Sequence, residues 1–508
     1  MTFQAIHRSF AGRVAERPDA TLFELPGGRV VTYGETAELA QRIAARLVAD
    51  GVVAGDRVAM QVDKSWEAIA LYLAVLQVGG MFLPLNTAYT GHEMEHFLTD
   101  AEPRVLVCSP ARLGEYAGRA SESLVVETLG ADGDGTLLAG LDAVAPHTDV
   151  YAAAPSDPAA ILYTSGTTGR SKGAVLTHRN LASNCAALTE AWRYTSGDRL
   201  IHALPIFHTH GLFVAMNLTL TTGASVFYLP RFDLDTVIAL LPKATVLMGV
   251  PTFYTRLAGD GRLDRERVAT MRLFVSGSAP LLASDHEAFA GRTGQAILER
   301  YGMTETCMNT SNPYDGARKP GTVGPALPGI EVRVADRETG AQVPDGEVGS
   351  IEVRGPNVFA GYWRLPEKTA AEFRADGFFI TGDVGRIDED GYVVIVGRDK
   401  DLVISGGFNV YPKEIEELID AHPDVLESAV IGVPHPDFGE TVVAVVVLRP
   451  GVDAGAVDGA GILAFIAPDL ARFKQPRAVQ IVESLPRNVM GKVQKAELRK
   501  RYAGLFTA

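Results

Sequence analysis

Residues Tyr163–Gly173 gather small hydroxyl and glycine residues around the cation of Lys172. Backbone N–H groups left open by small residues, together with hydroxyls and a lysine, can bind phosphate oxygens. A polar surface loop has the same composition, so composition alone leaves both interpretations open. The Walker pattern does not fit, because Gly173 follows the lysine and residues 174–176 favour a strand over a helix. The stretch predicts a phosphate-binding loop of another kind.

Four more segments of this character follow along the chain. They are Glu299–Thr306, Thr381–Asp383, Gly397–Asp401 with Gly406–Asn409, and Pro486–Lys492. In this order, the five segments resemble the signatures of the adenylate-forming enzymes, the family of acyl- and aryl-CoA synthetases, luciferases and peptide-synthetase adenylation domains. A single segment such as Thr-Gly-Asp would carry little weight, but five in order over residues 163–492 make a chance match negligible.

The resemblance implies a two-step reaction that uses ATP, Mg²⁺ and CoA. A carboxylate resists nucleophilic attack, so it is first converted to an acyl-adenylate, and the negative charge of that transition state needs cations and donors. By resemblance, Lys492 bridges the carboxylate and the α-phosphate, while Glu305 and Thr164 hold Mg²⁺. The catalytic residues expected are Lys492, Glu305 and His208. Without the motif, Lys492 would be interpreted as a solvated lysine of a basic tail.

The resemblance also supplies the nucleotide contacts. Tyr301 is expected to stack on adenine against Ser278–Pro280, and Asp383 to accept hydrogen bonds from the ribose with help from Arg398. Core packing is the alternative for Tyr301. The residues expected to bind ATP or AMP are Thr164, Ser165, Gly166, Thr167, Thr168, Gly169, Lys172, Ser278, Ala279, Pro280, Glu299, Arg300, Tyr301, Gly302, Met303, Thr304, Asp383, Arg398 and Lys492.

A small mobile domain is implied for residues 400–508, with its hinge at Lys400. In the family this domain rotates between the two steps, withdraws the lysine and presents a tunnel for the thiol. The residues expected to contact CoA are Gly406, Gly407, Phe473, Lys474 and Arg477. A solvated basic face explains the last three equally well. The loop around Lys492 is expected to be open to acetylation, which would remove its charge, so a lysine acetyltransferase and a deacetylase are candidate partners.

Segments 201–211, 249–257 and 307–314 resemble one subgroup, the malonyl-CoA synthetases. A long fatty acid would favour an apolar tunnel, whereas this pocket would contain polar groups and Arg256, whose charge a second carboxylate could compensate. We expect Arg256 on a helix capped by Thr252. The substrate contacts expected are His208, Thr209, Arg256, Ser278 and Met308. A solvated arginine and a core histidine are the alternatives for Arg256 and His208.

Two other functions stay open at this point. A short- or medium-chain acyl- or aryl-CoA synthetase is the alternative within the family. Arg256 is the feature that distinguishes the two, because a charged residue in the acyl pocket would suit a dicarboxylate. A catalytically silent nucleotide-binding protein is disfavoured, because such a protein would be expected to have lost Lys492 or Glu305. The small-molecule substrates expected are malonate, ATP and CoA, with methylmalonate as a further acid.

Composition narrows the class of protein. The 508 residues include 47 Lys and Arg against 61 Asp and Glu, a net charge of −14. Nucleic acid is therefore not an expected partner, since phosphate-backbone binding normally requires a basic excess. The longest apolar stretch, residues 68–85, is interrupted by glycines and a proline, and predicts a buried helix followed by a strand instead of a membrane span. We expect no membrane partner and a cytoplasmic protein.

The elements that must position these residues predict an α/β fold. Thr32 and Glu35 form a capping-box pattern before an amphipathic helix, and short apolar runs alternate with helical patterns. We expect a large domain, residues 1–399, of doubly wound, mainly parallel sheets with a small β-barrel-like part. Residues 400–508 are expected to form a small α+β domain. The predicted strands include 56–60, 104–108, 159–163, 245–249, 273–276, 349–354, 391–396 and 442–448.

Overall fold

The computed structural model describes residues 3–164, 171–405, 408–452, 457–488 and 491–506. The predictions for Ser165, Gly166, Thr167, Thr168, Gly169, Gly406 and Gly407 lie outside the described residues. The described helices are α1 (Ile6–Glu16), α2 (Tyr33–Ala49), α3 (Trp66–Gln77), α4 (Gly91–Ala101), α5 (Leu113–Tyr116), α6 (His178–Ala191), α7 (Asn217–Thr222), α8 (Leu234–Leu240), α9 (Pro251–Gly259), α10 (Ala283–Thr293), α11 (Pro366–Ala371), α12 (Pro412–Asp420), α13 (Gly459–Ile466) and α14 (Lys495–Tyr502).

A seven-stranded sheet has the order β17-β8-β7-β4-β3-β5-β6. Its strands are β3 (Arg57–Gln61), β4 (Met81–Pro84), β5 (Val105–Cys108), β6 (Val125–Thr128), β7 (Pro158–Thr164), β8 (Lys172–Thr177) and β17 (Gly361–Tyr362). The five strands from β7 to β6 are parallel, whereas β8 and β17 add antiparallel partners beside the phosphate loop. The predicted strand after that loop is confirmed as β8.

An eight-stranded sheet has the order β14-β13-β12-β11-β9-β10-β1-β2. Its strands are β1 (Thr21–Glu24), β2 (Val30–Thr32), β9 (Arg199–His202), β10 (Ser225–Tyr228), β11 (Val246–Gly249), β12 (Leu273–Ser276), β13 (Leu298–Met303) and β14 (Cys307–Ser311). Its central strands are parallel, and both edges are antiparallel pairs. Ligands of such sheets bind beyond the carboxyl ends of the strands, where β9, β11, β12 and β13 run into the predicted site segments.

The part predicted to be barrel-like is a four-stranded antiparallel sheet, ordered β15-β16-β18-β19. Its strands are β15 (Glu331–Ala335), β16 (Gly349–Arg354), β18 (Phe379–Ile387) and β19 (Val393–Arg398). A separate sheet follows in the C-terminal hundred residues, built from β20 (Val403–Ser405), β21 (Phe408–Val410), β22 (Val425–His435), β23 (Gly439–Leu448) and β24 (Ala478–Ile481). Helices α12 and α13 pack against this sheet over their own apolar cluster.

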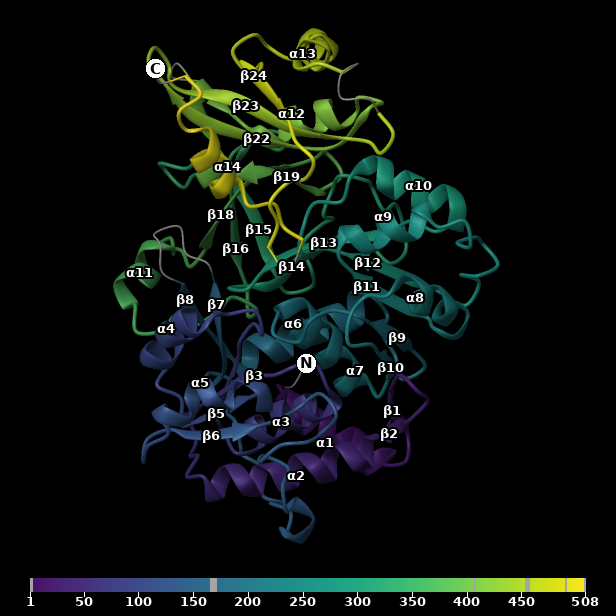
Figure 1. The fold of residues 1–508 in the computed structure, drawn as a ribbon, viewed down its shortest axis with the longest axis vertical. Helices are drawn as coiled ribbons and strands as arrows, with labels where there is room; N and C mark the ends of the chain where they lie inside the picture. Colours follow the sequence, from purple (N-terminus) through teal and green to yellow (C-terminus); the bar gives the residue numbers. More distant parts are fainter. Residues whose placement is uncertain (1–2, 165–170, 406–407, 453–456, 489–490, 507–508) are drawn as a thin grey trace.

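The C-terminal sheet lies at one end of the molecule, beyond the four-stranded antiparallel sheet (Figure 1). The chain between β24 and α14 extends from this sheet toward β13 and β14. Lys492 lies near Asp383, Arg398 and His208, so the fold brings a residue close to the C-terminus to the site segments of the large sheets. The domain limits 1–399 and 400–508 stay a prediction.

Local sequence signals explain several elements. Thr32 accepts a hydrogen bond from the Glu35 backbone N–H, and the Glu35 side chain accepts one from the Thr32 N–H, so the predicted capping box is confirmed. Helix α3 is buried on all sides and leads into β4, as the apolar stretch predicted. The predicted cap of α9 is wrong. Val250 is the cap residue and Pro251 occupies the first turn, where its missing N–H costs nothing. Among the described residues, no helix has the length and apolar character needed to cross a membrane.

Candidate active site

Three strands bring Tyr301, Asp383 and Arg398 together. Tyr301 lies on β13, and Asp383 on β18 is the register partner of Arg398 on β19. The Tyr301 hydroxyl donates to Asp383 Oδ2 at 2.5 Å, and Arg398 Nε lies 3.1 Å from Asp383 Oδ1. The charge of Asp383 is the main cause of the raised pKa of Arg398. A buried carboxylate is thus held between a hydroxyl and a guanidinium by charge-assisted contacts, and its predicted role toward ribose stays a prediction.

Lys492 lies beside this group. Burial, helped by the nearby charge of Arg398 and opposed by that of Asp383, lowers the pKa of its ammonium to about 8. Its backbone N–H donates to Asn488 Oδ1 at 3.0 Å, which ties it into a tight turn. A Cβ built on Gly491 would lie 4.0 Å from Thr252 Cγ2, so the turn rests against the start of α9. The lysine is therefore positioned at the edge where the phosphate and acyl segments meet.

Glu305 has the surroundings of a cation ligand. Its carboxyl is buried, and Oε1 accepts hydrogen bonds from Thr164 Oγ1 at 3.4 Å and from the Tyr362 hydroxyl at 3.1 Å. Burial raises its pKa. Within the described chain, no lysine or arginine forms an ion pair with it, and no group of three His, Cys, Asp or Glu could hold a metal. A carboxylate and a hydroxyl facing the phosphate loop fit Mg²⁺, which binds through few protein ligands plus phosphate oxygens.

The phosphate-loop lysine is engaged by residues that sequence reasoning missed. Lys172 Nζ lies 3.4 Å from Glu372 Oε1 and 4.1 Å from the centre of the Tyr362 ring. Tyr362 and Glu372 lie outside the five segments, and no motif marks them. The fold reveals them, because Tyr362 lies on β17, which pairs with β8, and Glu372 lies close to Lys172 at the start of β8.

Arg300 is a buried residue of β13. The residue is 4% exposed, and the side-chain atoms Nε and Nη2 have no hydrogen-bond partner among the described residues. Burial lowers its pKa to about 9. The backbone of Gly277 makes room for the guanidinium, since a Cβ there would lie 2.4 Å from Arg300 Cζ. A buried arginine without a carboxylate is costly, so this position calls for an anionic ligand.

Two histidines lie near this arginine, since its charge contributes to the lowered pKa of His208 and of His210. His210 Nδ1 lies 3.3 Å from Ser278 Oγ, while His210 Nε2 and the hydroxyl of Thr209 are buried without a partner in the described chain. Burial lowers the pKa of His208 to about 4, helped by the charges of Arg300 and Lys492. Ser278 has a φ of +72°, a strained conformation of the kind found at functional sites. Of the residues predicted for the acyl pocket, His208 and Ser278 thus lie near this buried cation.

Met308 lies on β14, which pairs with β13. It is buried, and a Cβ on Gly302 would lie 2.6 Å from its Cε, so Gly302 allows the thioether to approach β13. Asn184 donates to the Met308 carbonyl at 2.7 Å and fixes its backbone. Glu299 is buried 3.4 Å from His286 Nδ1 and accepts from the Gly321 N–H at 3.3 Å, which are packing contacts. The other residues predicted to bind the nucleotide, Ala279, Pro280, Met303 and Thr304, line the adjoining turns and are exposed or half-buried.

Arg256 is not brought into the buried group. Helix α9 turns Tyr254 and Leu257 inward, and Arg256 is exposed with its guanidinium 6.0 Å from the centre of the Phe232 ring. The alternative of an exposed helix arginine describes its surroundings in this structure. Arg300 is among the residues predicted to bind the nucleotide, so a role for its charge toward the acid was not predicted.

The residues predicted for CoA and for the hinge lie in the C-terminal part. Lys474 Nζ pairs with Glu414 at 2.7 Å, Arg477 lies 4.2 Å from the centre of the Phe438 ring, and Phe473 is 42% exposed. Lys400 is flanked by two paired carboxylates, because Asp399 binds Arg337 and Asp401 binds Arg499, each at 2.5 Å. Burial lowers the pKa of Lys400. The roles of these residues stay predictions.

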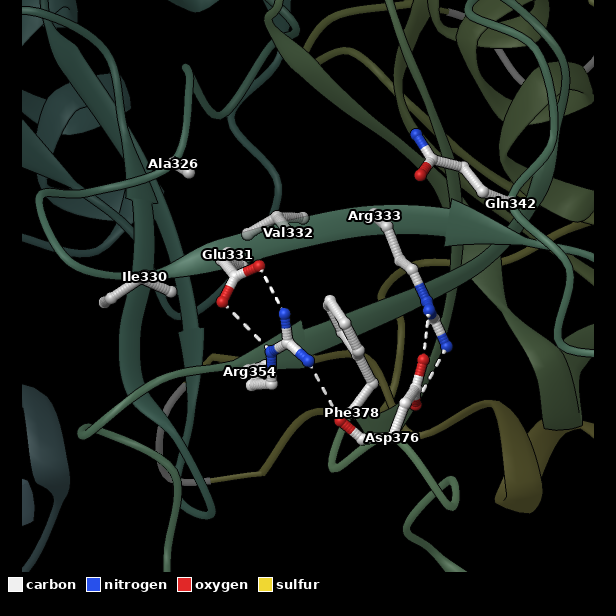
Figure 2. Close-up of a pocket in the computed structure, with 9 residues that line it drawn as sticks. All are labelled: Ala326, Ile330, Glu331, Val332, Arg333, Gln342, Arg354, Asp376 and Phe378. Carbon is white, nitrogen blue, oxygen red and sulfur yellow. Dashed lines mark hydrogen bonds and ion pairs between the residues drawn. The ribbon is translucent and has the colours of Figure 1, made fainter.

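A hollow of about 510 Å³ lies on β15 and β16, and none of the predicted site residues line it. Figure 2 shows two arginines on its wall, each turned toward a carboxylate. Arg354 pairs with Glu331, and Arg333 pairs with Asp376, both at 2.6 Å. Both guanidiniums also lie over the Phe378 ring. Since its cations are already neutralised, this hollow differs from the site around Arg300.

Comparisons with known proteins agree with this geometry. A family model of AMP-binding enzymes matches residues 10–363, and a model of their C-terminal domain matches residues 414–492. The chain belongs to the AMP-binding enzyme family, as the ordered segments predicted. Within it, the chain is an AMP-forming acid–CoA ligase that uses ATP, Mg²⁺ and CoA.

Several relatives cover almost the whole chain. A malonate–CoA ligase of Arabidopsis thaliana is 34% identical over 93% of this chain and 85% of its own. A feruloyl-CoA synthase of an Amycolatopsis species is 37% identical over 94% and 95%. The ATP-bound crystal structure of MatB from Rhodopseudomonas palustris is 56% identical, with a TM-score of 0.95 over 99% of this chain and 100% of that one. The apo structure of the same MatB gives 0.85, so the present arrangement is more similar to the ATP-bound one.

Proposed function

We propose that this enzyme is a malonyl-CoA synthetase. It would convert malonate and ATP to malonyl-AMP and pyrophosphate, and then malonyl-AMP and CoA to malonyl-CoA and AMP. The observation that carries the proposal is the buried guanidinium of Arg300, whose Nε and Nη2 lack partners within the described chain. A monocarboxylic acid uses its only carboxylate in the reaction, whereas malonate has a second one to pair with this cation.

Charge and size both favour a short dicarboxylate. His210 lies near Arg300, and its buried Nε2 also lacks a partner among the described residues, so an alkyl chain would leave both groups unpaired at a cost. Thr209 and Met308, which are both buried, would decide whether the 2-methyl group of methylmalonate fits. The similarity to a malonate–CoA ligase and to MatB supports the same acid.

The other residues have roles in the first step that follow from their places. Lys492, beside Asp383 and Arg398, would place its ammonium between the attacking carboxylate and the α-phosphate and stabilise the charge that develops there. Glu305 and Thr164 would hold Mg²⁺, which neutralises phosphate charge when it is bound. We also propose that residues 400–508 move about Lys400 between the steps. Phe473, Lys474 and Arg477 would then face CoA.

A substrate panel tests the proposed function. ATP- and CoA-dependent release of AMP is measured with malonate, methylmalonate, acetate, butyrate, octanoate and benzoate. Malonate should be preferred by at least about a hundredfold in kcat/KM, because the other acids except methylmalonate leave a buried arginine unpaired. A preference for octanoate or benzoate would keep the ligase activity and reject malonate in favour of the acyl- or aryl-CoA synthetase alternative, which the feruloyl-CoA synthase relative represents.

A further inference from the structure

Two carboxylates flank the hydroxyl group of Tyr362. Its oxygen lies 3.1 Å from Glu305 Oε1 and 2.7 Å from Glu372 Oε2. Tyr362 ends the short strand β17, and Glu372 caps α11 at its C-terminus. The hydroxyl therefore connects the carboxyl group expected to hold Mg²⁺ with a second carboxyl group that none of the sequence motifs contains.

Glu372 extends this connection to the phosphate loop. Its Oε1 lies 3.4 Å from Lys172 Nζ, and that ammonium also lies 4.1 Å from the centre of the Tyr362 ring. The side chains of Lys172 and Glu372 are only 13% and 20% exposed, so water and salt screen this ion pair less than a surface pair. One face of Lys172 is thus fixed by a carboxylate and an aromatic ring.

Backbone pairing and hydrogen bonds hold Tyr362 close to Lys172 and Glu305. Tyr362 pairs with Ala174 between β17 and β8, and the Trp363 N–H donates to the Gly173 carbonyl at 2.7 Å. Tyr362 is therefore anchored within three residues of Lys172. The Phe359 N–H donates to the Glu305 carbonyl at 2.8 Å, so the same segment is also tied to the turn that carries Glu305.

We propose that Tyr362 and Glu372 are positioning residues for the phosphates of ATP. Glu372 holds the ammonium of Lys172 at the end of the phosphate loop, and Tyr362 holds the carboxyl of Glu305 at a fixed distance from it. In protein kinases a lysine–glutamate ion pair likewise positions the lysine that contacts the phosphates. The inference concerns the ATP-binding step, which is common to every acid, so it does not rest on malonate as the substrate.

Three variants test the proposal. Glu372→Gln keeps the shape and removes the charge, and Tyr362→Phe keeps the ring beneath Lys172 and removes the hydroxyl. Lys368→Ala is the matched control. Lys368 pairs with the same Glu372 carboxylate at 2.7 Å, but it is 40% exposed and is not a residue of the phosphate loop. The dissociation constant of MgATP is measured by calorimetry without any acid, and steady-state kinetics and thermal unfolding are measured in parallel.

The two site variants should raise the dissociation constant of MgATP roughly tenfold, the size expected when a hydrogen bond to a charged group is lost. The KM for the acid should stay within about twofold, and Lys368→Ala should resemble wild type. Unchanged or tighter MgATP binding in Glu372→Gln would overturn the proposal. So would a parallel loss of ATP binding, acid binding and thermal stability, which would indicate a structural role only. If wild type prefers another acid, malonate is rejected but the expected loss of MgATP binding is unaffected.

Discussion

The guanidinium of Arg300 occupies the space that a side chain on Gly277 would fill, with 2.4 Å between the built Cβ and Arg300 Cζ. Gly277→Ala should therefore displace the arginine at a cost of about 1–3 kcal/mol and lower kcat/KM for malonate more than for butyrate. Gly291→Ala on α10 is the control, because a Cβ there meets nothing within 4 Å. Equal losses for both acids in Gly277→Ala would contradict a specific effect on Arg300.

Removal of the Lys492 ammonium should separate the two half-reactions. Lys492→Ala should abolish ATP–pyrophosphate exchange with malonate, because the charge beside Asp383 and Arg398 is lost. Thioester formation from supplied malonyl-AMP and CoA should continue at close to the wild-type rate, since the lysine is expected to be withdrawn in that step. An equal loss of both half-reactions would argue against movement of residues 400–508.

Acetylation of Lys492 should have the same effect. Burial lowers the pKa of this amine to about 8, so a larger fraction is neutral and nucleophilic at neutral pH than for an ordinary lysine. Enzyme acetylated stoichiometrically at this residue should lose adenylate formation, and deacetylation should restore it. Mass spectrometry of the modified site with a parallel AMP-release assay provides the measurement. Full activity of the acetylated enzyme would exclude regulation at this position.

Two buried histidines should make stability fall in acid. His7 and His178 lie with ring centres 5.5 Å apart, and burial lowers the pKa of each from 6.5 to about 4. Between pH 6.5 and 4 the unfolded chain binds protons that the folded chain does not, so the free energy of unfolding decreases as pH falls. His178→Phe should reduce the slope of that decrease by up to about 1.4 kcal/mol per pH unit. Urea unfolding at several pH values measures the slope, and an unchanged slope would contradict the assignment.

Local patterns were sufficient for much of the fold. The strands at 273–276 and 349–354 begin and end as predicted, because each is a short apolar run between polar turns. The cap of α9 was wrong, since a threonine signal was preferred over Pro251 in the first turn. Single residues within local patterns are thus less certain than the elements themselves.

Long-range contacts account for what the sequence did not reveal in the site. The segments of the family signatures mark Tyr301, Asp383, Arg398 and Lys492, and the fold brings these together. The environment of Arg300 depends on Gly277 of the neighbouring β12 connection, and no local pattern records that contact. Arg256 carried the same charge in a favourable segment but faces outward, because burial of Tyr254 and Leu257 fixes the face of α9.

Substitution of the two arginines shows which of them accepts the second carboxylate of malonate. AMP release is measured with malonate and butyrate for wild type, Arg300→Met and Arg256→Ala. Arg300→Met, which replaces the cation by an apolar side chain of similar length, should lower kcat/KM for malonate by at least about a hundredfold and preserve or raise it for butyrate. Arg256→Ala should keep the preference for malonate. Unchanged malonate selectivity in Arg300→Met, or its loss in Arg256→Ala alone, would contradict the account.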